Sequence, residues 1–105
     1  MTREEYAKLT DEEKRVKVAE HCGIKNIGRY SKYSSLMGEL DGRTVMILDY
    51  LNDLNACHEF EEFKTIEQHD KYDTLLDSIT RKAGIPSWNA TAAQRAEAFV
   101  LTLEN

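Results

Sequence analysis

The sequence predicts an α+β fold in which about four helices pack with a small antiparallel sheet, in an αβα sandwich-like arrangement. Three observations predict this class. Several segments begin with residues that favour a helix N-terminus, and in these segments apolar residues recur with the period of a helix. The dipeptide Asp41-Gly42, which favours a hairpin turn, lies between two short apolar runs. With 105 residues and no linker-like stretch, the chain is expected to form one domain over residues 1–105.

Threonine capping boxes mark the beginnings of three predicted helices. In such a box, the threonine and a Glu or Gln three residues later satisfy each other's free backbone amides. The first of these helices should end at Gly23 and the second at Gly84, because glycine tolerates the left-handed backbone of a helix stop. Residues 2–8 form a further turn or are frayed. The boxes are Thr10 with Glu13, Thr65 with Gln68, and Thr91 with Gln94.

Two-residue turn chemistry predicts a β-hairpin before residue 49. Asp41-Gly42 separates two short apolar runs and fixes their register. A further strand is expected across Ile27 to Tyr33. One sheet face then carries Leu36, Leu40, Val45 and Ile47, and the other carries Met37, Met46 and Leu48. The second face would be covered by the N-terminal helix or by a second copy of the chain in a homo-oligomer. The predicted pairs are Leu40 with Arg43, Gly38 with Val45, and Leu36 with Ile47.

Asp49 is predicted to cap another helix, over about residues 50–64. On a helical wheel its apolar side chains gather on two opposite faces, so this helix should lie between neighbours. One face carries Tyr50, Leu51, Leu54 and Cys57, and the other carries Ala56, Phe60 and Phe63.

Charge and composition limit the classes of partner. The chain has 19 acidic and 14 basic side chains, a formal net charge of −5, which disfavours nonspecific binding to nucleic acid. No apolar run is long enough to span a membrane, and no secretory signal begins the chain. We therefore expect a soluble cytoplasmic protein. No cofactor is implied, and Cys22 and Cys57 are expected to be buried thiols.

The order of these segments resembles a family of small bacteriophage proteins, the phage ABA sandwich domain. The likeness lies in Val18-Ala19-Glu20 before Gly23, in the helix-like opening at residues 50–58, and in the alanine-rich residues 90–98. Many members of this family place another strand pair, with tryptophans, before the last helix, where residues 65–83 here predict a helix. The resemblance implies a phage origin, with the cytoplasm of the host cell as the location. It implies no activity and supplies no catalytic residues.

Two groups of charged residues are candidate binding sites. An acidic run could dock on a basic partner, such as the nucleic-acid-binding groove of a host protein, or could be solvated surface. Cations interleaved with aromatic rings, in a region of residues 23–44 with a local charge of +2, could stack a base and hold a phosphate. Their alternative role is protection of an exposed strand. The acidic patch is Glu59, Glu62, Asp70, Asp73 and Asp77. The ligand set is Arg29, Tyr30, Lys32, Tyr33 and Arg43.

The remaining chemical signals are weaker. The pairs His21-Cys22 and Cys57-His58 suggest a zinc site, but sequential helical residues diverge by about 100°, which favours buried thiols beside boundary histidines. His58 and Glu61 could act as base and orienter, or form a solvated pair. Trp88 is either a lid that packs the last loop onto the core or an exposed anchor for a partner.

The sequence as a whole favours a non-enzymatic phage accessory protein that acts by binding a host component. One such role is antagonism of a bacterial defence system. The alternative is a small-ligand binder that sequesters an anionic nucleotide signal. A small hydrolase is the third hypothesis.

Overall fold

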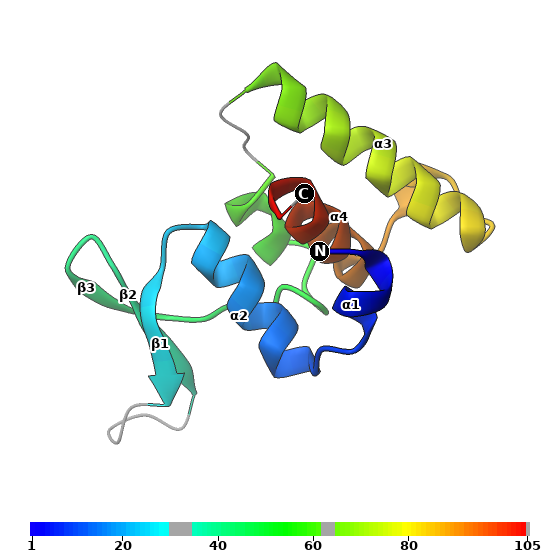
Figure 1. Cartoon of the computed structure of the whole chain (residues 1–105). Coiled ribbons are helices and arrows are strands. Elements are labelled where there is room, and N and C mark those ends of the chain that lie inside the picture. The colour runs from blue at the N-terminus through cyan, green and yellow to red at the C-terminus, as the bar shows by residue number, and fades with distance from the viewer. Residues whose placement is uncertain (30–34, 62–64, 105) are drawn as a thin grey trace.

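A computed structural model describes residues 1–29, 35–61 and 65–104 of the chain. The described part contains four α-helices, two short 3-10 helices and a three-stranded antiparallel sheet, which confirms the predicted α+β class. The sheet stands at one end of the molecule, with α2 beside it, and α4 lies between α2 and α3 (Figure 1). The elements are α1 (Arg3–Ala7), α2 (Asp11–His21), β1 (Lys25–Arg29), β2 (Leu36–Leu40), β3 (Arg43–Met46), η1 (Ala56–Glu59), α3 (Ile66–Lys82), η2 (Ser87–Asn89) and α4 (Ala92–Leu103).

The predicted helix boundaries are confirmed by their hydrogen bonds. At the end of α2, Gly23 has a φ of +92° and its amide bonds to the Glu20 carbonyl at 3.0 Å. The amide of Ile24 then reaches back to the Ala19 carbonyl at 3.1 Å, which completes a Schellman stop. The same pattern recurs after α3 at Gly84. Complete capping boxes lie at Thr2, Thr10 and Thr91, and at Thr65 the hydroxyl accepts from the Gln68 amide.

The hairpin adopts the predicted register. Asp41 and Gly42 have φ values of +51° and +78°, the two positive angles that a type I′ turn requires. Leu40 pairs with Arg43 and Gly38 with Val45, and the Ile47 amide bonds to the Leu36 carbonyl at 2.9 Å. Strand β1 begins at Lys25, two residues earlier than predicted, and ends at Arg29. The rest of the predicted strand, from Tyr30 to Tyr33, lies outside the described residues.

The predicted helix over residues 50–64 is wrong. Residues 50–55 form turns, a single 3-10 turn follows in η1, and residues 62–64 lie outside the described part. The cause is the density of Asn and Asp, whose side chains bond to nearby groups and compete with helix formation. The Asp53 carboxylate accepts from the Asn55 amide at 2.9 Å, and the Asn52 amide group donates to the Asp49 carboxylate at 3.2 Å.

The apolar residues of the described part of this segment still reach the core, apart from Leu54, which is exposed. Phe63, which was predicted for the second apolar face, lies outside the described residues. Phe60 stacks on Phe99 of α4, with ring centroids 4.6 Å apart, and Tyr50 packs edge-on against Phe60 at 5.9 Å. Helix α4 is the centre of this core and contacts α1, α2, α3 and η1. Its buried residues are Ala92, Ala96, Ala98, Phe99, Val100, Leu101 and Thr102.

Helix α1 packs on α4. The terminal ammonium of Met1 donates to the Glu104 carbonyl at 2.8 Å, and Arg3 pairs with Glu97 at 2.9 Å. On the second sheet face Met37 is buried, whereas Met46 remains 55% exposed. Among the described residues, no helix combines the length and apolar character that a membrane span needs.

Candidate functional site

Trp88 projects into solvent from the loop between α3 and α4. After the glycine stop, Pro86 is extended and begins the short helix η2, whose Asn89 amide bonds to the Pro86 carbonyl at 3.0 Å. This rigid turn holds the indole away from the core, and Trp88 is 78% exposed. The lid interpretation is therefore wrong. A large aromatic side chain held in the open by an ordered turn is typical of a contact residue.

An open hollow of about 550 Å³, here called the Trp88 groove, lies beside this side chain. It forms where the first half of α3 faces η2, α4 and the segment after η1. Its volume falls within the range of small-molecule and peptide-anchor sites, roughly 300–1,000 Å³. The groove is lined by Glu61, His69, Tyr72, Asp73, Leu76, Ser87, Trp88 and Arg95.

One carboxylate oxygen connects three segments at the floor of the Trp88 groove. The Tyr72 hydroxyl donates to Oε2 of Glu61 at 2.7 Å, and Nη1 of Arg95 donates to the same oxygen at 2.9 Å. Nε of Arg95 also donates to the Ala90 carbonyl at 3.3 Å. Burial, followed by the hydrogen bond to Glu61 and its charge, raises the pKa of Tyr72 far above its ordinary value. The tyrosine is therefore a neutral donor, and this network fixes the shape of the floor.

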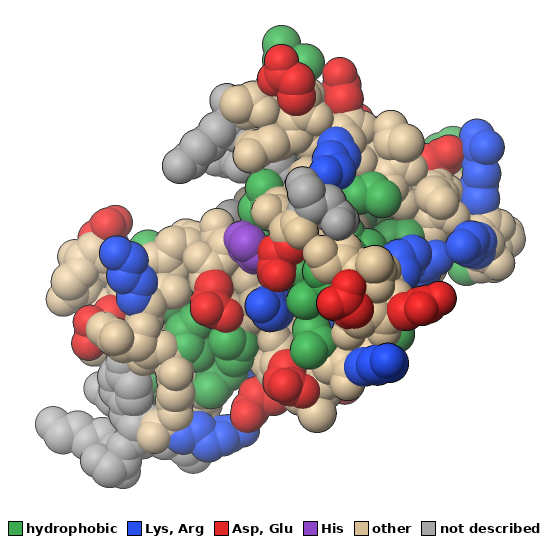
Figure 2. Space-filling view, viewed as in Figure 1, with side chains coloured by type: hydrophobic (Ala, Val, Ile, Leu, Met, Phe, Trp, Pro, Cys, Tyr) green, Lys and Arg blue, Asp and Glu red, His purple; other side chains and the backbone are tan. Residues whose placement is uncertain are grey.

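The rim of the groove continues into an acidic surface on α3. Asp70, Asp73 and Asp77, here called the acidic face, lie at a spacing that places them on one side of the helix. His69 lies 3.3 Å from Asp73, and Arg81 pairs with Asp77 at 3.0 Å. Figure 2 shows acidic side chains along α3, with basic side chains among them and at the C-terminal end of the helix.

The structure brings together three of the five residues predicted for the acidic patch. Asp70, Asp73 and Asp77 share the acidic face. Glu62 lies outside the described residues, and Glu59 is in η1, where its side chain is not described.

The residues predicted to bind an anionic ligand are placed differently. Tyr30, Lys32 and Tyr33 lie outside the described residues. Arg29 pairs with Leu36 at one end of β2, whereas Arg43 pairs with Leu40 at the other end. The offset along β2 is about 13 Å, and because Arg29 is on β1 and Arg43 on β3, two strand spacings of about 4.8 Å also separate them. The Arg29 guanidinium also donates to the carboxylate of Glu12.

The residues considered for metal binding or catalysis have other bonds. His21 Nε2 lies 2.9 Å from the Glu104 carboxylate. Burial, and then the charge of Glu61, raises the pKa of the Cys57 thiol to about 11. Glu61, which was paired with His58 in the catalytic hypothesis, instead accepts from the network on the groove floor. No three His, Cys, Asp or Glu residues gather in a metal-binding arrangement within the described ranges.

Sequence reasoning did not identify the Trp88 groove as a site. Tyr72 is a buried residue of α3, and its hydroxyl bond to Glu61 joins positions in separate segments. Arg95 lies 34 residues from its partner Glu61. The available signal was a single tryptophan beside the only proline, which indicates an ordered turn that carries an aromatic side chain.

No protein-family model, curated protein or solved structure matches this chain.

Proposed function

We propose that this is a non-enzymatic phage accessory protein, and that it binds a host protein through the Trp88 groove and the acidic face of α3. The observation that carries the proposal is the 78% exposure of Trp88 directly beside a groove and a row of carboxylates. Trp residues at the centre of an interface contribute disproportionately to binding energy once a partner removes them from water.

Charge determines the chemistry of the proposed partner. The acidic face lies in a chain of net charge −5, so a basic segment is attracted and an acidic one repelled. A lysine or arginine of that segment would also gain from lying over the indole ring of Trp88. A host protein with a basic nucleic-acid-binding groove has this chemistry. Occupying such a groove is one way in which a small protein would antagonise a bacterial defence system.

The phage origin and the host setting are supported by the family resemblance of residues 18–20, 50–58 and 90–98. A binding function is favoured over catalysis because Glu61 and Tyr72 are bonded to each other on the groove floor. Sequestration of an anionic nucleotide by the residues around β1 is less favoured. Arg29 is bound to Glu12, and Arg43 lies at the opposite end of the sheet.

The single tryptophan provides a direct assay, because all indole fluorescence of the protein reports on this site. Titration with a Lys/Arg-rich peptide should shift the emission of Trp88 to shorter wavelength as the ring leaves water. The apparent affinity should fall steeply as salt is raised from low to physiological concentration. An acidic peptide of equal length should give no shift.

Matched variants assign the effect to these residues. Asp70→Asn with Asp73→Asn should weaken binding of the basic peptide, whereas Glu4→Gln, an exposed carboxylate on α1, should not. For capture from host lysate, Trp88→Ala should release the partner, and Leu54→Ala, also an exposed apolar residue, should retain it. Equal binding of basic and acidic peptides, or a partner held independently of both Trp88 and salt, would overturn the proposal.

A further inference from the structure

Strand β3 forms an open edge of the sheet. The strand order is β1-β2-β3, so β1 and β3 are the two edge strands. Among the described helices and strands, β2 is the only one in extensive contact with β3, and Figure 1 shows β3 at the outer end of the molecule. An edge strand presents backbone N–H and C=O groups onto which another strand can add.

The register of the hairpin determines which backbone groups of β3 point outward. In a hairpin with a two-residue turn, the residues that flank the turn exchange hydrogen bonds, so the backbone groups of Arg43 point toward β2. Every second residue does the same, and the Ile47 amide accordingly bonds to a carbonyl of β2. The backbone groups of Thr44 and Met46 therefore point away from β2, and no described residue bonds to them.

The two edges of the sheet differ in their protection against pairing. Strand β1 has the features that block an edge in natural proteins, namely a bulge between Lys25 and Gly28, a φ of +52° at Asn26, and a charged residue at each end. The centre of β3, Thr44-Val45-Met46, has no charge, proline or bulge, and Met46 is 55% exposed. Strand β3 is thus the edge that can accept another strand.

We propose that β3 pairs with β3 of a second copy of the chain, antiparallel and about a two-fold axis at Val45, to form a six-stranded sheet. Thr44 of each copy then lies opposite Met46 of the other copy, and each of these two pairs exchanges two hydrogen bonds. The two Val45 side chains face each other, and the exposed Met46 packs across the strands on Thr44. The edge is therefore complementary to itself, and β1 does not extend the assembly beyond two copies.

Charge complementarity at the ends of β3 favours a second copy over an unrelated strand. Arg43 is exposed and has no carboxylate partner in the described part of the chain, and Asp49 is exposed beyond the other end of the strand. In the proposed register Arg43 lies opposite Ile47 of the second copy, and Asp49 is the next residue on that face, within reach of a long side chain. Symmetry forms this pair twice. The interface shares no residue with the Trp88 groove and does not depend on the proposed docking.

The association is tested by sedimentation equilibrium of the whole chain from about 20 µM to about 1 mM. The interface is small and belongs to the weak class, so we expect a monomer–dimer equilibrium with a dissociation constant on the order of 100 µM and no larger species. On dilution, the amide NMR signals of Thr44 and Met46 should shift, and those of Ser87 and Trp88 should not. A protein that is still monomeric at about 1 mM, or one whose signals shift around Trp88 instead, would refute the proposal.

A proline variant assigns the dimer to the outward groups of β3. Thr44→Pro removes an amide hydrogen that β2 does not use, so the hairpin should form and dimerisation should weaken at least about tenfold. Thr44→Val is the matched control, because it keeps this amide and should dimerise like the parent. Equal dimerisation of Thr44→Pro and Thr44→Val would contradict pairing through this edge.

A charge exchange tests the antiparallel register and does not require the proline variant to fold. Arg43→Glu and Asp49→Arg should each be monomeric alone, because like charges then meet at both ends of the strand pair. An equimolar mixture of the two variants should recover the dimer, since opposite charges again meet at both ends. If the mixture associates no more than either variant alone, the proposed register is wrong.

Discussion

Substitution of Gly38 tests the packing of the sheet most sharply. A Cβ atom at this position would lie 2.4 Å from Cγ2 of Ile24 and 3.2 Å from both Cγ1 of Ile27 and the Lys25 carbonyl oxygen. The first distance is far below van der Waals contact, and the Ile24 backbone is fixed by the stop of α2. In Gly38→Ala, the Ile24 side chain or the backbone that carries it must therefore shift. Overpacking of this kind costs about 2 kcal/mol, which lowers the Tm of a chain of this length by roughly 8 °C or more.

The assay is equilibrium urea unfolding followed by circular dichroism. Gly28→Ala is the matched control, because it lies on the neighbouring strand and a Cβ there meets nothing within 4 Å. Ile24→Ala removes the atom that causes the clash, so the double variant with Gly38→Ala should lose less stability than the two single variants combined, by about 1 kcal/mol. If Gly38→Ala unfolds at the same urea concentration as the parent, the close packing of Ile24 and β1 against Gly38 is wrong.

Three further predictions concern titrating or buried groups. Burial opposes ionisation of Glu104, but the hydrogen bond from His21 and the charge of Lys17 lower its pKa below the ordinary value. Its carboxylate therefore stabilises the fold above about pH 4.5 and loses this effect as the pH falls further. When the free energy of unfolding in urea is measured at a series of acid pH values, Glu104→Gln should show a smaller decrease with falling pH than the parent protein. Cys57, with its pKa of about 11, should stay unmodified by a disulfide reagent at pH 8 until the protein unfolds, and half-buried Cys22 should react first. A fast-reacting thiol in Cys22→Ser would contradict this. Tyr72→Phe should cost about 1.5 kcal/mol in urea unfolding, because Glu61 loses a donor, and an unchanged midpoint would show that this bond contributes nothing.

Local backbone chemistry made much of the fold predictable. The threonine boxes and the stops at Gly23 and Gly84 act over a few residues, so their outcome does not depend on distant parts of the chain. The turn at Asp41-Gly42 fixed the hairpin register for the same reason. The helix predicted after Asp49 was wrong because its apolar spacing is typical of a helix, whereas its Asn and Asp side chains form local hydrogen bonds that compete with one.

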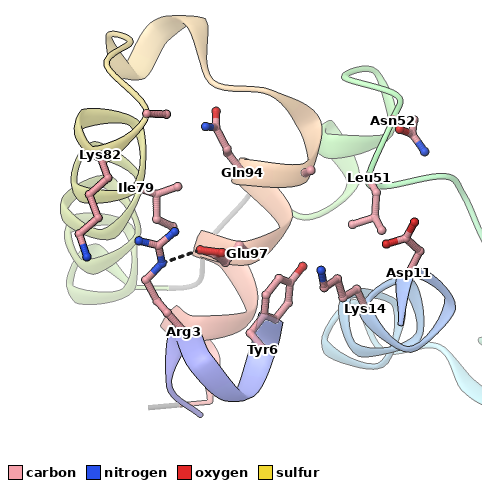
Figure 3. Close-up of a pocket in the computed structure, with 12 residues that line it drawn as sticks. Arg3, Tyr6, Asp11, Lys14, Leu51, Asn52, Ile79, Lys82, Gln94 and Glu97 are labelled. Carbon is pink, nitrogen blue, oxygen red and sulfur yellow. Dashed lines mark hydrogen bonds and ion pairs between the residues drawn. The ribbon is translucent and has the colours of Figure 1, made fainter. Parts of the chain in front are cut away.

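The candidate sites were less predictable because their contacts are long-range. The exposure of Trp88 depends on the direction that the chain takes between the end of α3 and η2, and the periodicity of apolar residues does not encode that direction. The bond between Arg95 and Glu61 joins residues 34 positions apart. Tyr6 lies in residues 2–8, which the sequence predicts to be either a turn or frayed. Its hydroxyl has no hydrogen-bond partner within the described part of the chain, and this burial arises only from the packing of distant helices (Figure 3).

The central position of α4 has a consequence for synthesis in the cell. The other three α-helices and η1 all pack on this helix, which leaves the ribosome after them. Until residues 92–103 emerge from the exit tunnel, the apolar faces of α2 and α3 have no surface to cover them, and the nascent chain is open to chaperones and proteases. The core formed by residues 1–103 therefore cannot be completed until α4 has emerged from the ribosome.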